Sequence, residues 1–331
     1  MVNKIREYLF KTDLCQVLNL NKEFNINFLA QGEYNINYTI SDENKNFVFR
    51  INTASQLRLE NQINYEFEAL KAIEKSGVTP KGLFVDGTKK YFDFGILVME
   101  FLEGRPLNYS SDLEIASHIF SKIHSININN LKENNFIMEN NIFKDRISES
   151  TWLLENFFAS PIPSKKLKSF FANYLEWCDK NLYKESFFAE NSWKVINNTE
   201  VNSHNFIIGK KGYLIDWEKP VISHPCQDLT QFLADTTTLW RNNYIMSKEE
   251  KEFFLKSYAN KVNHSLDEIK TSIEMYNPYL YLRALSWCAM AFIDYQTEDK
   301  LLRNDEIFNK IKSYLNFDFL SNLLKPYDIK I

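Results

Sequence analysis

A change of apolar pattern near residue 102 constrains the fold of this chain most. Between residues 26 and 102, short apolar runs separated by turn residues predict strands, in INFLAQGEYNINYTI, KNFVFRINT, GLFVDGT and FGILVMEFL. After the Gly- and Pro-containing joint EGRPL (103–107), helical periodicity predicts helices over 112–126, 164–182, 225–241, 248–261, 266–296 and 303–324. We therefore expect an α+β chain with a small sheet-rich lobe, residues 1–102, and a larger helical lobe, residues 103–331.

One helix interrupts the strands of the small lobe. In residues 59–77, Ile63, Phe67, Leu70 and Ile73 recur at helical spacing, and Gly77 stands where a helix would stop. The small lobe is therefore expected to contain an antiparallel sheet and one helix.

Composition excludes several classes of function. The formal net charge of −4 gives no basic field for a nucleic acid. The opening residues MVNKIREYLFKTDL lack a signal-type apolar core, and apolar runs such as WCAMAFI are too short to cross a membrane. The four cysteines are scattered without a C-x-x-C pair, which argues against a zinc site or a disulfide framework. We expect a cytoplasmic protein that binds neither nucleic acid nor membrane.

The stretch VINNTEVNSHNFIIGKKGYLIDWEKP, residues 195–220, gathers oxygen-bearing side chains around a hairpin. NFII and YLID read as strands joined by a four-residue loop, Gly209–Gly212. Counting back from that loop places Asn205 opposite Asp216 at the open end of the hairpin.

These side chains have the chemistry of a magnesium site. Amide and carboxylate oxygens are hard ligands, and Mg²⁺ takes one or two protein groups together with water and phosphate oxygens. Glu200 precedes the hairpin in a loop, where its carboxylate can accept a proton. The alternative is structural, because Asn and Asp also cap hairpins. Asp228, in HPCQDLTQFLAD, begins an apolar helix and either caps it or braces the loop.

The residues around this hairpin resemble the aminoglycoside phosphotransferase and choline kinase branch of the protein-kinase-like fold. That family has a catalytic loop H-x-D-x-x-x-x-N followed by a hairpin and a magnesium-binding Asp. In NTEVNSHN, Asn198 takes the place of the His, Glu200 takes the place of the Asp, and Asn205 matches the Asn. IDWE supplies Asp216 as the metal ligand.

The resemblance extends back to about residue 25 with its motifs in order. LAQGEYNINYTI is similar to the phosphate loop, FVFRI supplies the third-strand cation, YEFEAL supplies its helix partner, and LVMEFLEGRPL resembles the hinge that binds adenine through main-chain groups. By resemblance, the nucleotide-binding residues are Gly32, Asn35, Arg50, Glu66, Glu100 and Leu102.

The resemblance implies an ATP- and Mg²⁺-dependent enzyme that transfers the γ-phosphate to a hydroxyl of a small cationic molecule, an aminosugar or a choline-like amino alcohol. In that reading Glu200, Asn205 and Asp216 are catalytic, and Asn205 and Asp216 bind the metal. The aromatic stretch 275–299, with Trp240 and with Asp294 or Glu298, forms either a cage for an ammonium group or part of the core.

Glu200 departs from the family pattern by one methylene group. This leaves a second hypothesis, a kinase-like nucleotide-binding protein with weak or no catalysis. Separately, a third hypothesis is that the fold transfers another part of ATP, such as AMP. The sequence leaves open the identity of the acceptor, the choice between ATP and GTP, and the oligomeric state.

Overall fold

The computed structural model describes residues 1–21, 23–32, 34–55, 59–129, 131, 136–191, 193–297 and 304–330. The chain forms two compact units, and each is discontinuous in sequence. The first contains Met1–Leu107, Asn129–Phe136 and Asn205–Pro220; the second contains Asn108–Ile128, Ile137–His204 and Val221–Ile331. The segment 205–220, which the sequence analysis assigned to the helical lobe, therefore lies with the sheet.

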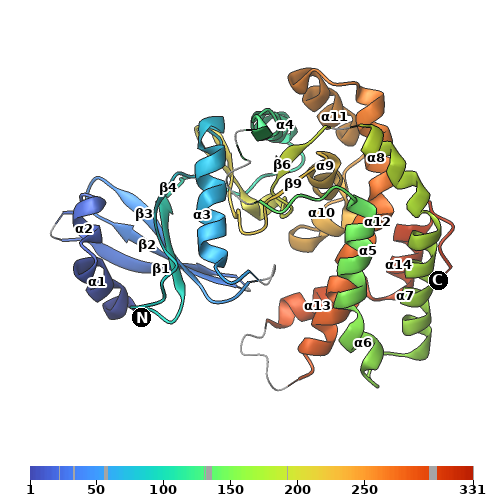
Figure 1. The fold of residues 1–331 in the computed structure, drawn as a ribbon, viewed down its shortest axis with the longest axis horizontal. Coiled ribbons are helices and arrows are strands. Elements are labelled where there is room, and N and C mark those ends of the chain that lie inside the picture. Colours follow the sequence, from blue (N-terminus) through green and yellow to red (C-terminus); the bar gives the residue numbers. More distant parts are fainter. Residues whose placement is uncertain are drawn as a thin grey trace. The chain divides into compact units, whose positions relative to one another are not determined.

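The first unit is built on a five-stranded antiparallel sheet in the order β1-β2-β3-β5-β4 (Figure 1). This confirms the small antiparallel sheet. Its strands are β1 (Asn25–Gln31), β2 (Asn35–Ser41), β3 (Asn46–Asn52), β4 (Gly82–Asp86) and β5 (Gly95–Glu100).

The two faces of the sheet differ in what covers them. Phe49 and Ile51 of β3 point into an apolar cluster with residues of α1 (Val2–Lys11) and α2 (Leu14–Val17). Arg50, between them, has its ion-pair partner on α3 (Gln62–Ile73), which packs on β4 and β5. Because successive side chains of a strand face opposite ways, α3 and Arg50 share the face opposite α1 and α2. Figure 1 shows these helices on the two sides of the sheet.

A hairpin of β7 (Phe206–Ile208) and β8 (Gly212–Leu214) completes the first unit. Its observed pairs are Phe206 with Leu214, Ile207 with Tyr213 and Ile208 with Gly212.

The expected hairpin register was wrong by one residue. The Gly209 N–H donates to the Lys211 carbonyl at 2.9 Å, so the chain turns through three residues and Gly212 joins the strand. Asn205 consequently lies opposite Ile215, whose N–H donates to its carbonyl at 2.8 Å, and not opposite Asp216.

The hairpin crosses the segment after β5 at very close range. Arg105 and Ile208 exchange two backbone hydrogen bonds of 3.0 and 2.7 Å. A Cβ atom at Gly209 would lie 2.3 Å from the carbonyl oxygen of Glu103, and one at Gly104 would lie 2.7 Å from that of Ile208. Since no side chain fits at either position, glycine is required at both for the two backbones to pair.

The second unit is mainly helical. Its helices α4–α8 are Leu113–His124, Ile142–Leu153, Glu155–Ala159, Lys165–Lys180 and Ser186–Glu190. Its helices α9–α14 are Cys226–Leu233, Asp235–Arg241, Lys248–Val262, Leu266–Asp294, Asp305–Tyr314 and Phe317–Leu324. A short two-stranded sheet pairs β6 (Val195–Asn197) with β9 (Val221–Ser223).

Two of the expected helices are each broken in two. The helix expected over 225–241 is interrupted at Ala234, whose extended backbone (ψ 137°) ends α9 and precedes α10. The helix expected over 303–324 is interrupted at Asn316, whose side chain caps α14 by accepting the Asp318 N–H. In both cases the apolar periodicity continues across the break, so it did not mark the boundary.

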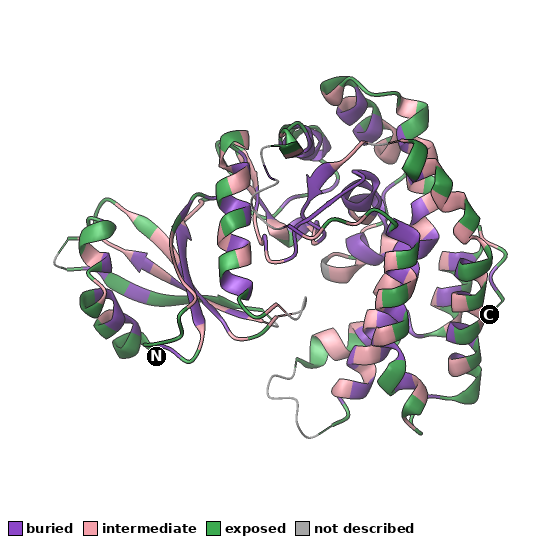
Figure 2. Ribbon diagram, in the orientation of Figure 1, coloured by how far each residue is buried: buried purple, intermediate pink, exposed green. Residues whose placement is uncertain are grey.

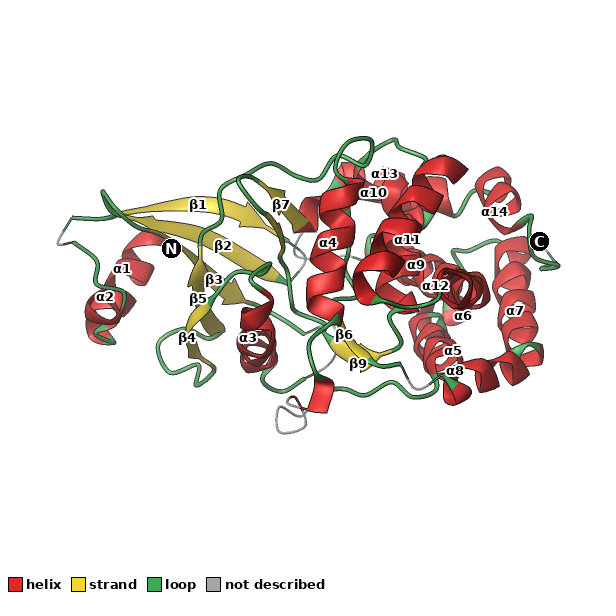
Figure 3. Ribbon diagram, turned by 90° about the horizontal axis from the view of Figure 1, so that it is seen from above, coloured by secondary structure: helices red, strands yellow, loops and turns green. Residues whose placement is uncertain are grey.

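The core of the second unit surrounds α12, the longest helix (Figure 2). Pro278 lies inside this helix, and its carbonyl accepts the hydroxyl of the buried Tyr174 on α7 at 2.6 Å. Figure 3 shows α12 beside α5, α6 and α9, which pack on it. Within the described residues, no helix has the length and hydropathy needed to cross a membrane.

Candidate functional site

Arg50 is the centre of a charged cluster in the first unit. Its Nη1 nitrogen donates to Glu66 of α3 and, at 3.0 Å, to Asp216 after β8. Its Nε donates to the Asn37 amide oxygen at 3.0 Å. The arginine side chain is nearly buried, whereas the side chain of Asp216 is 28% exposed. The structure therefore brings the predicted cation, its predicted helix partner and the predicted metal ligand together.

The carboxylates of this cluster outnumber the cation. Burial raises the pKa of Glu66 to about 7 although Arg50 opposes the shift, and its Oε2 has no hydrogen-bond partner within the described residues. Burial, and next the charge of Asp216, raise the pKa of Glu218 to about 8. Burial disfavours charge on Arg50, but Glu66, Asp216 and Glu218 raise its pKa above the usual value. Arg50, with Lys219 acting on Glu218, therefore offsets the repulsion among these three carboxylates only in part.

Glu218 belongs to this cluster, although the sequence analysis did not identify it. Its Oε2 accepts the Asn35 amide at 2.7 Å. Trp217 between Glu218 and Asp216 is fully buried, and its indole donates to the Leu214 carbonyl at 3.1 Å. The two acids flanking a buried Trp in IDWE were the signal available in the sequence.

The two residues expected near the phosphates differ in their surroundings. Asn35 begins β2, is buried, and accepts the Asn52 amide at 2.9 Å while donating to Glu218. Gly32 precedes β2, and its N–H donates to the Asn35 carbonyl at 2.9 Å. A Cβ atom at Gly32 would meet only that carbonyl oxygen, at 3.9 Å, so the described fold itself does not require glycine there.

Asn205 and Asp216 bracket the hairpin. Asn205 precedes β7 and pairs through its carbonyl with Ile215, so it lies one residue from Asp216 in the register. Asp216 has a left-handed backbone (φ 63°), which turns the chain immediately after the pairing ends.

The hinge residues expected to bind adenine lie at and just after the end of β5. The Glu100 N–H already donates to the Lys81 carbonyl at 3.0 Å. Leu102 follows β5 outside the sheet, is partly exposed, and has no backbone hydrogen bond to other described residues. Leu102 is therefore the hinge residue with main-chain groups available to a ligand.

Glu200 lies in the second unit, in the loop between β6 and β7. Its N–H donates to the Asn198 amide oxygen at 2.9 Å. The buried Asp228 accepts the Asn198 and Thr199 N–H groups at 2.7 and 2.8 Å, and Thr199 has φ 65°. Of the two roles considered for Asp228, it therefore braces the loop.

His124 packs against Asp228, which braces this loop. It is buried on α4, with Nδ1 2.8 Å from the Tyr258 hydroxyl and Nε2 3.5 Å from Asp228. Through His124, Asp228 is therefore connected to α4 and, by way of Tyr258, to α11.

The aromatic residues considered for an ammonium cage pack largely against the helical core. Trp240 and Trp287 meet edge to face with centroids 5.6 Å apart, and both remain partly exposed. Tyr295 is buried and stacks on Phe308 at 5.1 Å. Asp294 ends α12, and Glu298 lies outside the described residues.

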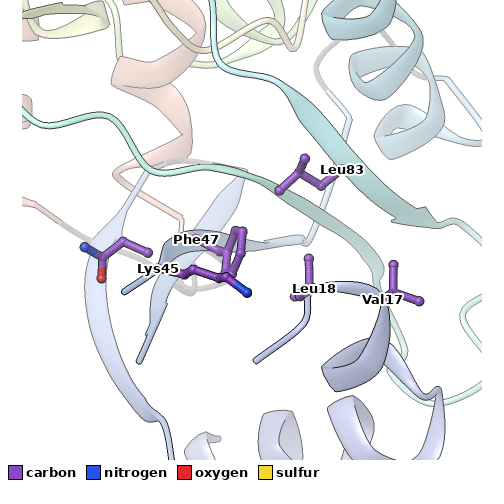
Figure 4. Close-up of a pocket in the computed structure, with 6 residues that line it drawn as sticks. Val17, Leu18, Lys45, Phe47 and Leu83 are labelled. Atoms are coloured by element: carbon purple, nitrogen blue, oxygen red, sulfur yellow. The ribbon is translucent and has the colours of Figure 1, made fainter. Parts of the chain in front are cut away.

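A shallow pocket of about 430 Å³ lies elsewhere in the first unit (Figure 4). Val17, Leu18, Lys45, Asn46, Phe47 and Leu83 line it. None of these is a candidate site residue. The described residues contain no group of three or more His, Cys, Asp or Glu side chains arranged to hold a metal. Magnesium does not need such a group, because one or two carboxylates plus phosphate oxygens suffice.

Comparison with known proteins identifies related sequences and folds. Residues 25–258 match the model of a family described as the phosphotransferase enzyme family. No curated protein matches the chain.

Solved structures share the fold at low sequence identity. The choline kinase LicA from Streptococcus pneumoniae is 20% identical, with a TM-score of 0.62 over 97% of this chain and 99% of its own. An ethanolamine kinase from Plasmodium vivax is 14% identical, with a TM-score of 0.66 over 97% and 90%. A spectinomycin phosphotransferase, in complex with ADP and spectinomycin, is 15% identical, with a TM-score of 0.61 over 94% and 96%. These similarities place the chain in the kinase-like, two-lobed α+β fold class.

Proposed function

The chain belongs to the phosphotransferase enzyme family, and from this we propose that it transfers the γ-phosphate of ATP to a hydroxyl group of a small cationic molecule. The observation that carries the proposal is the sharing of Arg50 between Glu66 and Asp216. A buried guanidinium fixed by a helix carboxylate is suited to neutralise phosphate charge beside a metal-binding carboxylate.

The donor set at the hairpin fits Mg²⁺. Asp216, Glu218 and Asn205 offer hard oxygen atoms. Burial, and next the charge of Asp216, raise the pKa of Glu218, and a divalent cation would favour its charged form. Asp216 and Asn205 would hold the metal, and Glu218 would be a further ligand. When bound, the metal neutralises charge that develops on the transferred phosphoryl group.

Other residues bind the nucleotide and orient the acceptor. Arg50, held by Glu66, would pair with phosphate oxygens, and the backbone at Gly32 would approach them with no side chain in the way. The hinge at Glu100 and Leu102 would receive the adenine edge, with the main chain of Leu102 available. Glu200 would accept the proton of the acceptor hydroxyl and orient it for attack.

The proposed acceptor is an amino alcohol or an aminosugar. The supporting observations are the fold shared with choline, ethanolamine and spectinomycin kinases and the partly exposed Trp240 and Trp287. The four cysteines are free, which suits a reducing compartment, so the cytoplasm stays the proposed location.

The length of Glu200 favours a second candidate function, a nucleotide-binding protein that transfers little or no phosphate. A carboxylate displaced by about 1 Å can cost on the order of 10²-fold in rate. Acceptor-dependent release of ADP separates the two, because only an enzyme gives it. Mass spectrometry of the products would detect AMP transfer instead.

Calorimetric titration of ATP with and without Mg²⁺ tests the nucleotide site. We expect Mg²⁺-dependent binding by the natural chain and its loss in Asp216→Ala, because the metal loses a carboxylate. Magnesium dependence that survives in Asp216→Ala would remove this residue from the metal site. No binding by the natural chain would reject the proposed function.

Turnover of the Glu200→Gln variant tests the proposed base. We expect nucleotide binding close to normal and a loss of turnover of about 10² to 10⁴-fold, since Gln cannot accept the proton. Equal turnover in a screen of amino alcohols and aminosugars would exclude Glu200 from the mechanism.

A further inference from the structure

Helix α3 is hydrogen-bonded to the segment that carries the metal-binding carboxylates. The Gln62 amide donates to the Glu218 carbonyl at 2.5 Å, and the Tyr65 hydroxyl donates to the Pro220 carbonyl at 2.5 Å. Both acceptors are backbone atoms. The contacts therefore fix the path of the chain through residues 218–220 independently of the state of its carboxylates.

Helical spacing places these donors beside the ion-pair glutamate. Gln62, Tyr65 and Glu66 occupy positions i, i+3 and i+4 of α3 and so share one face. Gln62 is buried, and its Oε1 accepts the Ser55 hydroxyl at 2.6 Å, so its nitrogen is left to face Glu218. The Tyr65 ring also packs edge to face on Phe136 at 5.6 Å. Both donors are thus held in place before any ligand binds.

We propose that Gln62 and Tyr65 are positioning residues that hold α3 against residues 216–220, so that Glu66 and Asp216 converge on one nitrogen of Arg50. We call these two side chains and their two carbonyl acceptors the α3 clamp. Its role in catalysis rests on the proposed function. In the phosphotransferase reaction the third-strand cation, its helix carboxylate and the metal-binding Asp must all be in place together.

The clamp gives the site a fixed geometry before nucleotide arrives. In protein kinases the position of the corresponding helix is a point of control. Here three independent contacts join α3 to the metal-binding segment: Gln62 to Glu218, Tyr65 to Pro220, and Glu66 to Asp216 through Arg50. The Arg50–Glu66 pair therefore forms without a separate activating step.

Nitrogen-15 NMR of arginine side chains tests the clamp in the ligand-free full-length protein. Arg50→Lys assigns the Arg50 signal, and the test variants are Tyr65→Phe and the double variant Gln62→Met, Tyr65→Phe. In the natural chain we expect resolved Nη hydrogens, because Glu66 and Asp216 block rotation of the guanidinium. In the double variant we expect rotation at least about tenfold faster, with Tyr65→Phe intermediate.

Tyr8→Phe is the matched control. The Tyr8 hydroxyl donates to Asp86 at 2.9 Å, within the same unit, and Tyr8 packs in the core on the sheet face opposite Arg50. This variant should leave the Arg50 signals unchanged. Unchanged Arg50 rotation in the clamp variants, or the same loosening in Tyr8→Phe, would overturn the proposal. Should the double variant fail to fold, Tyr65→Phe, which removes one oxygen atom, decides alone.

Calorimetry then measures what the clamp contributes to ligand binding. We expect Mg²⁺-dependent ATP affinity to fall about tenfold in the double variant. ATP affinity without Mg²⁺ should fall less, through Arg50 alone, and the affinity of Tyr8→Phe should stay unchanged. Unaltered Mg²⁺-dependent affinity would contradict a positioning role. If the natural chain bound no nucleotide, the proposed function would fail, and the NMR result would still decide whether the clamp positions Arg50.

Discussion

At the scale of single residues, His224 shows how burial fixes a protonation state. Burial, and then the neighbouring His264 and His124, lower its pKa to about 3. Its Nδ1 accepts the Cys226 N–H at 3.2 Å, and the rings of Phe188 and Trp193 lie against it. An imidazole that accepts this bond is neutral in the folded protein, whereas it takes up a proton below pH 6.5 once the chain unfolds.

We therefore expect His224 to destabilise the fold in mild acid. Its folded pKa lies below the unfolded value, so its stabilisation is present above pH 6.5 and is lost as the pH falls toward 3. Between pH 7 and 5 the free energy of unfolding should fall by about 2 kcal/mol more in the natural chain than in His224→Asn. The Asn oxygen can still accept the Cys226 N–H. Urea unfolding at several pH values measures this, and parallel curves for the two proteins would contradict it.

At the scale of structural elements, one carboxylate shapes the loop that carries Glu200. Asp228, in the first turn of α9, uses both oxygens to accept the N–H groups of Asn198 and Thr199. Asn198 in turn accepts the Glu200 N–H. The loop therefore depends on α9 for its conformation, and Asn198 makes a local bond that a side-chain amide can supply where the family has His.

Asp228→Asn should disrupt this loop. An amide has one oxygen, so its NH₂ group would face a backbone N–H, and leaving a buried donor unsatisfied costs about 1–3 kcal/mol. We expect a loss of stability of that size in urea unfolding, together with lower turnover. Asp179→Asn, on the exposed side of α7, is the control and should behave as the natural chain does. Natural stability in Asp228→Asn would show that the brace is dispensable.

Some of the strands and helices were predictable from the sequence and others were not. The strands of the five-stranded sheet, the hairpin strands and α3 followed from alternation and helical spacing, whereas β6 and β9 were not predicted. Helix α5 was missed, because its buried face includes Arg146 and Ser150, which do not read as apolar. The hairpin was found but misregistered, because a single hydrogen bond from Gly209 selects a three-residue turn. Patterns of burial were thus readable, whereas buried polar residues and turn geometry were not.

The candidate site was predictable to a similar extent. Arg50, Glu66 and Asp216 were named from the resemblance and lie together. Gln62 and Tyr65 were not, because their role depends on carbonyl groups more than 150 residues away, at Glu218 and Pro220. Contacts between side chains and a distant backbone leave no motif in the sequence.

At the scale of the whole molecule, the first unit is assembled from distant parts of the chain. The sheet ends near residue 107, yet the hairpin at 205–220 belongs to the same unit. It supplies Asp216 to Arg50 and pairs with the chain at Arg105. The first unit can therefore be completed only when residues 205–220 are present, and these follow much of the helical unit in sequence.

During synthesis on the ribosome, the sheet is made well before the hairpin that completes its unit. At 5–20 residues per second, the 113 residues from 107 to 220 take roughly 6 to 23 s, during which the sheet lacks its hairpin and Arg50 lacks Asp216. We expect arrested nascent chains that end before residue 205 to be cleaved by protease within residues 1–107, and chains from which residue 220 has emerged to resist. Equal resistance in both would mean that the sheet folds without its hairpin. The candidate site is thus begun first and finished late, because a growing chain contains Arg50 and Glu66 before it contains Asp216.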